Sequence, residues 1–117
     1  MVVGTAGFAG AVARFGVATL FARLGVAFPV GTLVINVAGS MALGALFGWG
    51  ESRGVIPEHL RLAIGVGFLG AFTTFSTFSV ESDALLRDGL TTRAIVYVLL
   101  SVTLGLLAAR AGYVLAR

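Results

Sequence analysis

The chain has 117 residues, of which 58% are hydrophobic and 11% charged, with a mean hydropathy of +1.04. A small water-soluble domain has much surface for its volume, and eight basic and five acidic side chains are too few to cover it. The absence of cysteine excludes disulfides and thiolate metal sites, and a single histidine, His59, excludes a multi-histidine metal site. All eight basic residues are arginines spread evenly along the chain, which argues against a nucleic-acid partner. We therefore predict one small domain whose solvent is lipid.

Four apolar stretches are long enough to cross a bilayer, which takes roughly 20 residues each. They cover residues 2–21, 30–49, 62–80 and 94–116. Arg14 interrupts the first stretch and Arg110 lies near the end of the fourth. The connections are short and charged, and they leave no room for a soluble domain. The sequence thus predicts an all-α membrane protein in which residues 1–117 form a single four-helix transmembrane domain.

The second stretch carries small and polar residues at every fourth position: Asn36, Ser40, Gly44 and Gly48. On a helix these residues share one face, and small residues at this spacing allow close backbone approach to a neighbouring helix. An amide in the middle of a membrane needs a partner or a purpose. Asn36 is therefore expected either to form a structural hydrogen bond between helices or to serve as a donor in a transport pathway.

The arginines give no clear signal for orientation. An even number of spans puts both termini on one side, and arginine in short loops sets which side that is. Three arginines fall on each side of the membrane: Arg53, Arg61 and Arg117 with the termini, and Arg23, Arg87 and Arg93 opposite them. We interpret this tie as insertion in both orientations, with pairing to an inverted copy. The alternative is that the boundaries are shifted, which would bring Arg14 or Arg110 into the count.

The third stretch contains the run "GVGFLGAFTT", with three glycines and two threonines, and both residue types weaken helices. We predict a break between Gly70 and Phe75. Non-helical backbone at membrane depth persists only where protein buries it or where it lines a wet cavity. The carbonyls that a break frees are suited to a small hard cation such as Na⁺. The alternative is that the glycines only allow close packing.

Hydroxyls and aromatic rings are concentrated around the predicted break. Each set alone is ordinary, because membrane hydroxyls often bond back to their own helix. Together with Asn36 they indicate a narrow path rich in hydrogen-bond donors, in which hydroxyls and positive ring edges replace the water around an anion. The residues predict an anion path and do not name the ion. The sets at helical spacing are Phe72, Phe75 and Phe78; Thr73, Thr77 and Glu81; Ser76, Ser79 and Asp83; and Tyr97 with Ser101.

Three motifs resemble those of the Fluc (CrcB-type) fluoride channels. The segment "GFLGAFTTFSTFSVE", residues 67–81, closely resembles their third-helix motif. The segments "GTLVINVAGS", residues 31–40, and "GFAGAVARF", residues 7–15, are similar to their second- and first-helix motifs. The motifs occur in the right order, and the resemblance covers essentially the whole chain in length and in helix number.

The resemblance implies an antiparallel, dual-topology homodimer with two fluoride pores. It implies that ring edges of Phe75 and Phe78 coordinate fluoride. It also implies a structural Na⁺ at the dimer centre, held by backbone carbonyls of Gly70 and Thr73 from both chains, and an aqueous vestibule near Arg14. One departure is Gly105, where similar proteins often carry a hydroxyl one turn beyond Ser101. The implied fluoride pathway comprises Asn36, Phe75, Phe78, Ser76, Thr77, Glu81, Tyr97 and Ser101.

The function that the resemblance implies is passive fluoride export through the cell (inner) membrane of a prokaryote, giving fluoride resistance. The alternative is a small dual-topology multidrug exporter, which requires a carboxylate deep in the membrane. The first two stretches contain no Asp or Glu, and Glu81 falls near a helix end. A non-transporting assembly subunit would leave the hydroxyl and aromatic cluster unexplained. An enzyme is not expected, because the sequence shows no nucleophile–base pair, metal-ligand cluster or phosphate loop.

Overall fold

The structure, a computed structural model, describes residues 1–25, 28–54 and 56–117. These residues form four helical spans that are long and apolar enough to cross a membrane, as predicted. Three of the spans are single α-helices, whereas the third is a succession of four helical pieces. The elements are α1 (Val2–Arg23), α2 (Val30–Ser52), α3 (Glu58–Arg61), the π-helix η1 (Leu62–Leu69), α4 (Gly70–Phe72), α5 (Phe75–Arg87) and α6 (Thr91–Ala116).

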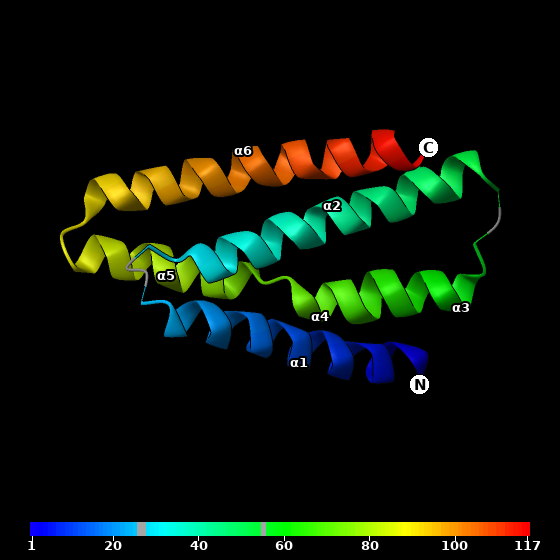
Figure 1. Ribbon diagram of the computed structural model, residues 1–117, viewed down its shortest axis with the longest axis horizontal. Helices are drawn as coiled ribbons and strands as arrows, with labels where there is room; N and C mark the ends of the chain where they lie inside the picture. Colours follow the sequence, from blue (N-terminus) through cyan, green and yellow to red (C-terminus); the bar gives the residue numbers. More distant parts are fainter. Residues whose placement is uncertain (26–27, 55) are drawn as a thin grey trace.

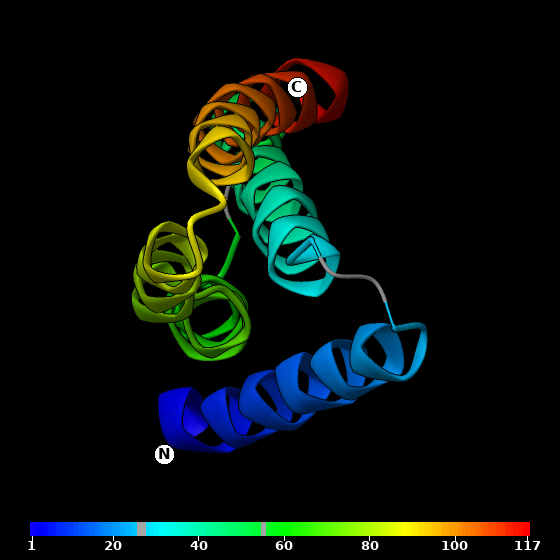
Figure 2. The same ribbon diagram turned by 90° about the vertical axis from the view of Figure 1, so that its left-hand side faces the viewer.

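The spans run roughly along one direction in a body of 49 × 29 × 21 Å, with both termini at the same end (Figure 1). The helices α2 and α6 form the most extensive contact in the fold, and α1 packs against η1 and α4. The end-on view shows α1 crossing below the third span, on the side away from α6 (Figure 2). The shared end of the termini agrees with an even number of crossings.

The boundaries of the third span differ from the prediction. The span runs from Glu58 to Arg87, well beyond residues 62–80, because the acidic segment expected to be a connection continues as α5. The turn into α6 is short and contains Gly89 with φ 76°, a left-handed conformation that favours glycine. The other two predicted connections, residues 22–29 and 50–61, include positions outside the described residues.

Glycine brings α2 and α6 into backbone contact. A Cβ atom added at Gly44 would clash with the Ala109 carbonyl, and one added at Gly112 would clash with the Met41 carbonyl. Gly48 meets the backbone of α6 in the same way, one turn further along. The prediction that the small residues of the second span allow close packing is therefore confirmed for Gly44 and Gly48.

Most apolar side chains point away from the chain's own interior. Between 6% and 28% of each span is buried, and α1 is the least buried. The largest fully buried side chains are Tyr97 and Ile35, and Tyr97 clusters with Leu85 and Ala94 near the α5–α6 turn. A chain with so small an interior depends on lipid or on a second protein chain to cover its outer surface.

Candidate functional site

The third span is interrupted at two residues. Thr73 (φ −82°, ψ 157°) and Thr74 (φ −151°, ψ 122°) are extended between α4 and α5. The predicted break is confirmed, but it is narrower than the expected segment from Gly70 to Phe75. Gly70 itself is helical, with φ −62° and ψ −38°, and begins α4. Its glycine identity does not cause the interruption.

The segment before the break is a π-helix, which the sequence analysis did not predict. In η1 the backbone hydrogen bonds span five residues rather than four, and such segments are rare and often lie at functional sites. Its glycines allow α1 to lie directly against its backbone. A Cβ atom at Gly67 would press on Val3 and Ala6, and one at Gly10 would clash with the Phe68 carbonyl.

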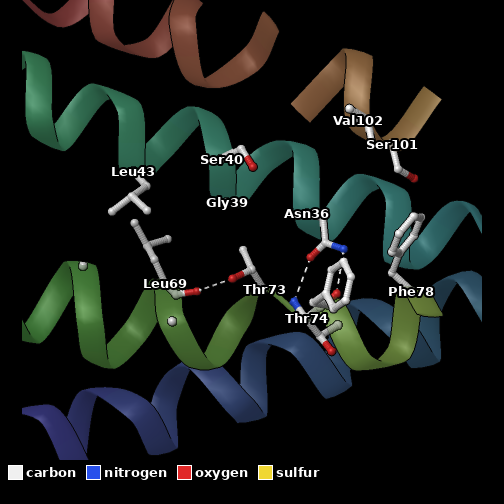
Figure 3. Close-up of a pocket in the computed structure, with 13 residues that line it drawn as sticks. Asn36, Gly39, Ser40, Leu43, Leu69, Thr73, Thr74, Phe78, Ser101 and Val102 are labelled. Atoms are coloured by element: carbon white, nitrogen blue, oxygen red, sulfur yellow. Dashed lines mark hydrogen bonds between the residues drawn. The ribbon is translucent and has the colours of Figure 1, made fainter. Parts of the chain in front are cut away.

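Asn36 of α2 holds the break in place. Its Nδ2 donates to the Thr74 carbonyl at 2.9 Å, and its Oδ1 accepts from the Thr74 N–H at 2.8 Å (Figure 3). The side-chain amide thus supplies both hydrogen bonds that the backbone of Thr74 loses outside a helix. Of the two predicted roles for Asn36, the structure shows the interhelical hydrogen bond. The second Nδ2 hydrogen has no acceptor among the described residues, and a pathway role stays a prediction.

The hydroxyls that follow the break are gathered at the start of α5. Thr74 is the N-cap residue, and its Oγ1 accepts from the Thr77 N–H at 3.2 Å. The same hydroxyl donates to Thr77 Oγ1 at 3.2 Å and lies 3.3 Å from Ser76 Oγ. Threonine is a favoured cap because its oxygen satisfies an otherwise free N–H of the first turn. Thr74 therefore both ends the extended segment and starts the next helix.

The break also frees carbonyl groups at the end of α4. Arg14 of α1, half-buried, donates from Nε to the Ala71 carbonyl at 3.1 Å. A charged side chain at this depth needs such a partner. Within the described ranges, no hydrogen-bond donor reaches the carbonyls of Gly70 or Thr73. These two carbonyl oxygens are therefore without a hydrogen-bond donor among the described residues.

A cavity of about 340 Å³ lies between α2, the broken span and α6 (Figure 3). Glu81 does not line it and instead borders a separate cavity of about 160 Å³ beside α1 and the start of α2. The lining of the 340 Å³ cavity also does not include Ser76, Thr77 or Arg14. The predicted site residues that line the larger of these two cavities are Asn36, Gly70, Thr73, Phe75, Phe78 and Ser101.

The aromatic rings form two groups, one on each side of the break. The ring centroids of Phe75 and Phe78 are 5.7 Å apart, with an angle of 51° between the ring planes. The centroids of Phe78 and Tyr97 are 5.2 Å apart, with an interplanar angle of 54°. Phe72 instead stacks on Phe68, with 5.9 Å between the ring centroids and 12° between the ring planes. The prediction that Phe72 shares a side with Phe75 and Phe78 is therefore wrong, because helical spacing does not extend across an extended segment.

The same error affects the hydroxyl set. Thr73 is itself an extended residue of the break, and it donates to the Leu69 carbonyl at 2.9 Å. Because the helix is interrupted there, Thr73 does not share a helical face with Thr77 and Glu81. Ser79 is exposed and donates back to the Phe75 carbonyl at 3.0 Å, which is the ordinary behaviour of a membrane hydroxyl.

Tyr97 and Ser101 are the buried polar groups of α6. Tyr97 is completely buried, and its hydroxyl donates to Glu81 Oε1 at 3.2 Å. The rings of Phe28 and Tyr97 pack edge to face, with 5.4 Å between their centroids and 88° between their planes. Ser101 Oγ is buried and has no hydrogen-bond partner among the described residues. A buried hydroxyl without a partner is costly in a protein interior, so it calls for a ligand or water.

Three residues of this site were not predicted in the roles that the structure shows. Thr74 was assigned to the break without its capping role, and Phe28 was assigned to a connection. Ser40 was placed on the face of Asn36 but not in the site, although it lines the larger cavity. The four-residue spacing from Asn36 to Ser40 was the signal that could have found it.

A four-span helical membrane protein whose third span is broken beside a cavity lined by hydroxyls and rings belongs to the class of small polytopic membrane proteins. The family described as "CrcB-like protein, Camphor Resistance (CrcB)" matches residues 1–113. The chain belongs to this family.

Curated relatives in three bacteria carry the name "Fluoride-specific ion channel FluC". The Methylobacterium sp. (strain 4-46) protein is 48% identical over 101 residues, which is 86% of this chain and 81% of the relative. The Deinococcus radiodurans protein is 54% identical over 98 residues, covering 84% of this chain and 75% of the relative. The Chlorobium phaeobacteroides (strain BS1) protein is 40% identical over 117 residues, covering 100% and 91%.

Proposed function

We propose that this protein is a fluoride-selective channel that lets fluoride leave the cytoplasm down its electrochemical gradient, and so confers fluoride resistance. The relatives' name supplies the ion. The observation in this chain that supports it is the cavity at the break, which is lined by Phe75, Phe78 and Ser101. The Ser101 hydroxyl has no hydrogen-bond partner among the described residues. Positive ring edges and O–H donors can replace the water shell of a small anion without a fixed counter-charge.

Passive conduction needs no group that binds and releases protons in each cycle. An inside-negative potential favours anion exit by about 2.3 kcal/mol per elementary charge for each 100 mV. The carboxylate of Glu81 accepts a hydrogen bond from the Tyr97 hydroxyl. We assign Glu81 and Tyr97 to one end of the path, where the second cavity lies. Arg14 is assigned to a vestibule, and Ser76 and Thr77 to the wall beside the break.

We further propose that the working unit is an antiparallel homodimer of two inverted copies in the inner membrane. The small buried fraction of each span supports a second chain that covers part of the outer surface. The arginine tie between the two ends supports insertion in both directions. A C-terminal topology reporter tests this, since a reporter found on one side only would contradict dual insertion.

A structural Na⁺ between the two copies is part of the same proposal. Hard cations prefer oxygen ligands, and freed backbone carbonyls at broken membrane helices are a known source of them. The carbonyls of Gly70 and Thr73 fit this requirement because no described donor occupies them, and both residues line the cavity. The ion would hold the two breaks together when it is bound.

The decisive test is fluoride efflux from liposomes that contain the purified protein, followed with an ion-selective electrode. We expect rapid efflux that depends on the membrane potential and does not require a proton gradient. Folded protein that gives no efflux would refute the proposal. Efflux of a cationic drug driven by a proton gradient would instead indicate the multidrug exporter, which the relatives' names do not favour.

The substitution Phe78→Ile tests the ring contribution. Isoleucine keeps an apolar side chain but removes the positive ring edge that would face the anion. We expect a fall in fluoride efflux of at least roughly tenfold, the equivalent of about 1.4 kcal/mol from a barrier. The control is Phe8→Ile, since Phe8 is 73% exposed on α1 and lies away from the cavity. An unchanged rate in Phe78→Ile would remove this ring from the pathway.

A further inference from the structure

The polar groups of the larger cavity differ in how far they are already committed. Asn36 is bonded twice to Thr74, and Thr73 donates to the Leu69 carbonyl. Thr74 uses its hydroxyl to cap α5. Two hydroxyls that line the cavity make no hydrogen bond to any described residue. They are Ser40 of α2 and Ser101 of α6.

Ser40 is half-buried in the middle of α2, one turn beyond Asn36. Five other hydroxyls donate to the carbonyl four residues earlier: Thr5, Ser52, Ser79 and Ser82 within helices, and Thr73 just after α4. Ser40 does not make this bond within the described part of the chain. Its Oγ is thus free to turn toward the cavity, where Figure 3 shows it on the α2 wall.

The helix opposite Ser40 offers space in place of a side chain. A Cβ atom added at Gly105 of α6 would lie 3.9 Å from Ser40 Oγ, at ordinary contact distance. Gly105 follows Ser101 by one turn of α6 and is half-buried. At Gly44, Gly48 and Gly112 an added Cβ would clash with backbone, whereas at Gly105 it would meet only this hydroxyl. Close packing therefore does not explain the glycine at this position.

We propose that Ser40 is a pathway residue, and that it supplies from α2 the hydroxyl that α6 lacks at Gly105. The donor series along α6, Tyr97 and then Ser101, continues on α2 through Ser40. The permeating anion, or the water that accompanies it, moves from the Ser101 hydroxyl to the Ser40 hydroxyl inside the cavity. This inference rests on the proposed fluoride conduction and names one further residue that performs it.

The test exchanges the hydroxyl between the two helices. Ser40→Ala removes it with almost no change in volume, and Gly105→Ser in the same chain returns a hydroxyl from the opposite wall. The control is Thr103→Ala, which removes an exposed hydroxyl from α6 outside the cavity. Each variant is measured by liposome efflux with an ion-selective electrode, and its thermal unfolding is recorded in detergent.

We expect Ser40→Ala to reduce fluoride efflux by about three- to tenfold, the effect of one lost hydrogen bond in the rate-limiting region. Ser40→Ala/Gly105→Ser should recover most of the wild-type rate, and Thr103→Ala should match wild type. Efflux from Ser40→Ala at the wild-type rate would overturn the proposal. So would a loss that Gly105→Ser does not repair, because packing and not the hydroxyl would then be the cause. Efflux from the wild-type protein tests fluoride conduction separately. If the wild type gives no efflux, the proposed function has failed, and the variant rates are then not compared with it.

Discussion

The helix α2 makes two contacts of opposite kinds. It packs closely against α6, and it forms hydrogen bonds to the broken third span. Toward α6, α2 presents Gly44 and Gly48, and the two backbones meet with no side chain between them. Toward the break, it presents Asn36, whose amide bonds an extended backbone at two points. The contact with α6 depends on the absence of Cβ atoms at the two glycines, and the contact with the break depends on the single amide group of Asn36.

The difference shows how a small membrane protein can combine rigidity with an irregular segment. Regular helices already satisfy their own backbone, so they need only shape to pack. An extended residue in the membrane has free N–H and C=O groups, and each must find a partner or pay several kcal/mol. The α2–α6 contact is therefore spread over many residues, whereas the break relies on a few hydrogen bonds.

The largest effect is expected from Asn36→Leu, which keeps the volume but removes both bonds to Thr74. We expect a loss of about 2–4 kcal/mol in unfolding free energy, since two backbone groups are left unpaired in a medium without water. Thermal unfolding in detergent measures this. Ala38→Leu adds the same side chain at an exposed position of α2 and should be nearly neutral. If both variants unfold alike, the break does not depend on Asn36.

Gly44→Ala tests the other contact. One methyl group at this position must displace the Ala109 carbonyl, and overpacking of this kind typically costs about 1–3 kcal/mol. The matched control is Gly16→Ala on α1, where an added Cβ meets nothing within 4 Å. We expect the control to leave the unfolding temperature unchanged or raise it, because alanine favours a helix over glycine. Equal destabilisation by both substitutions would contradict the close contact of α2 with α6.

The smallest effect on stability is expected from Tyr97→Phe, which keeps the buried ring and removes the hydroxyl that donates to Glu81. Hydrogen bonds between membrane helices average about 0.6 kcal/mol. We nevertheless expect slower fluoride efflux, because this hydroxyl belongs to the proposed path. Tyr113→Phe removes the hydroxyl that donates to Glu51 at the opposite end of the fold and should leave efflux unchanged. Parallel losses in both variants would indicate a general effect of removing tyrosine hydroxyls.

The four spans could be predicted from the sequence because each property that defines them is local. Apolar runs of sufficient length mark the crossings, and glycines at every fourth position mark the α2–α6 contact. The break was predicted for a related reason, since glycine and threonine weaken helices wherever they occur. Its position at Thr73 and Thr74, rather than at Gly70, depends on which residues find partners elsewhere in the fold.

The rest depends on contacts between distant parts of the chain. Asn36 and Thr74 are separated by 38 residues, and nothing near Thr74 in the sequence indicates its partner. The grouping of Phe72 with Phe75 failed because face assignments assume an unbroken helix. Likewise, the partner of Arg14 is a carbonyl that becomes free only once the break exists. Sequence spacing alone therefore could not predict which distant groups these residues contact.

The π-helix before the break has a consequence for sequence comparison and for protein engineering. Each hydrogen bond in η1 encloses one residue more than in an α-helix, so the direction in which α4 and Thr73 point depends on how many residues Leu62–Leu69 contains. A substitution there leaves the residue count unchanged, whereas deletion of a single residue would turn the whole segment that follows about the helix axis. The number of residues in η1 thus sets the rotation of the break about the helix axis. Two chains with similar residues but one residue more or fewer in η1 would present different groups to the cavity.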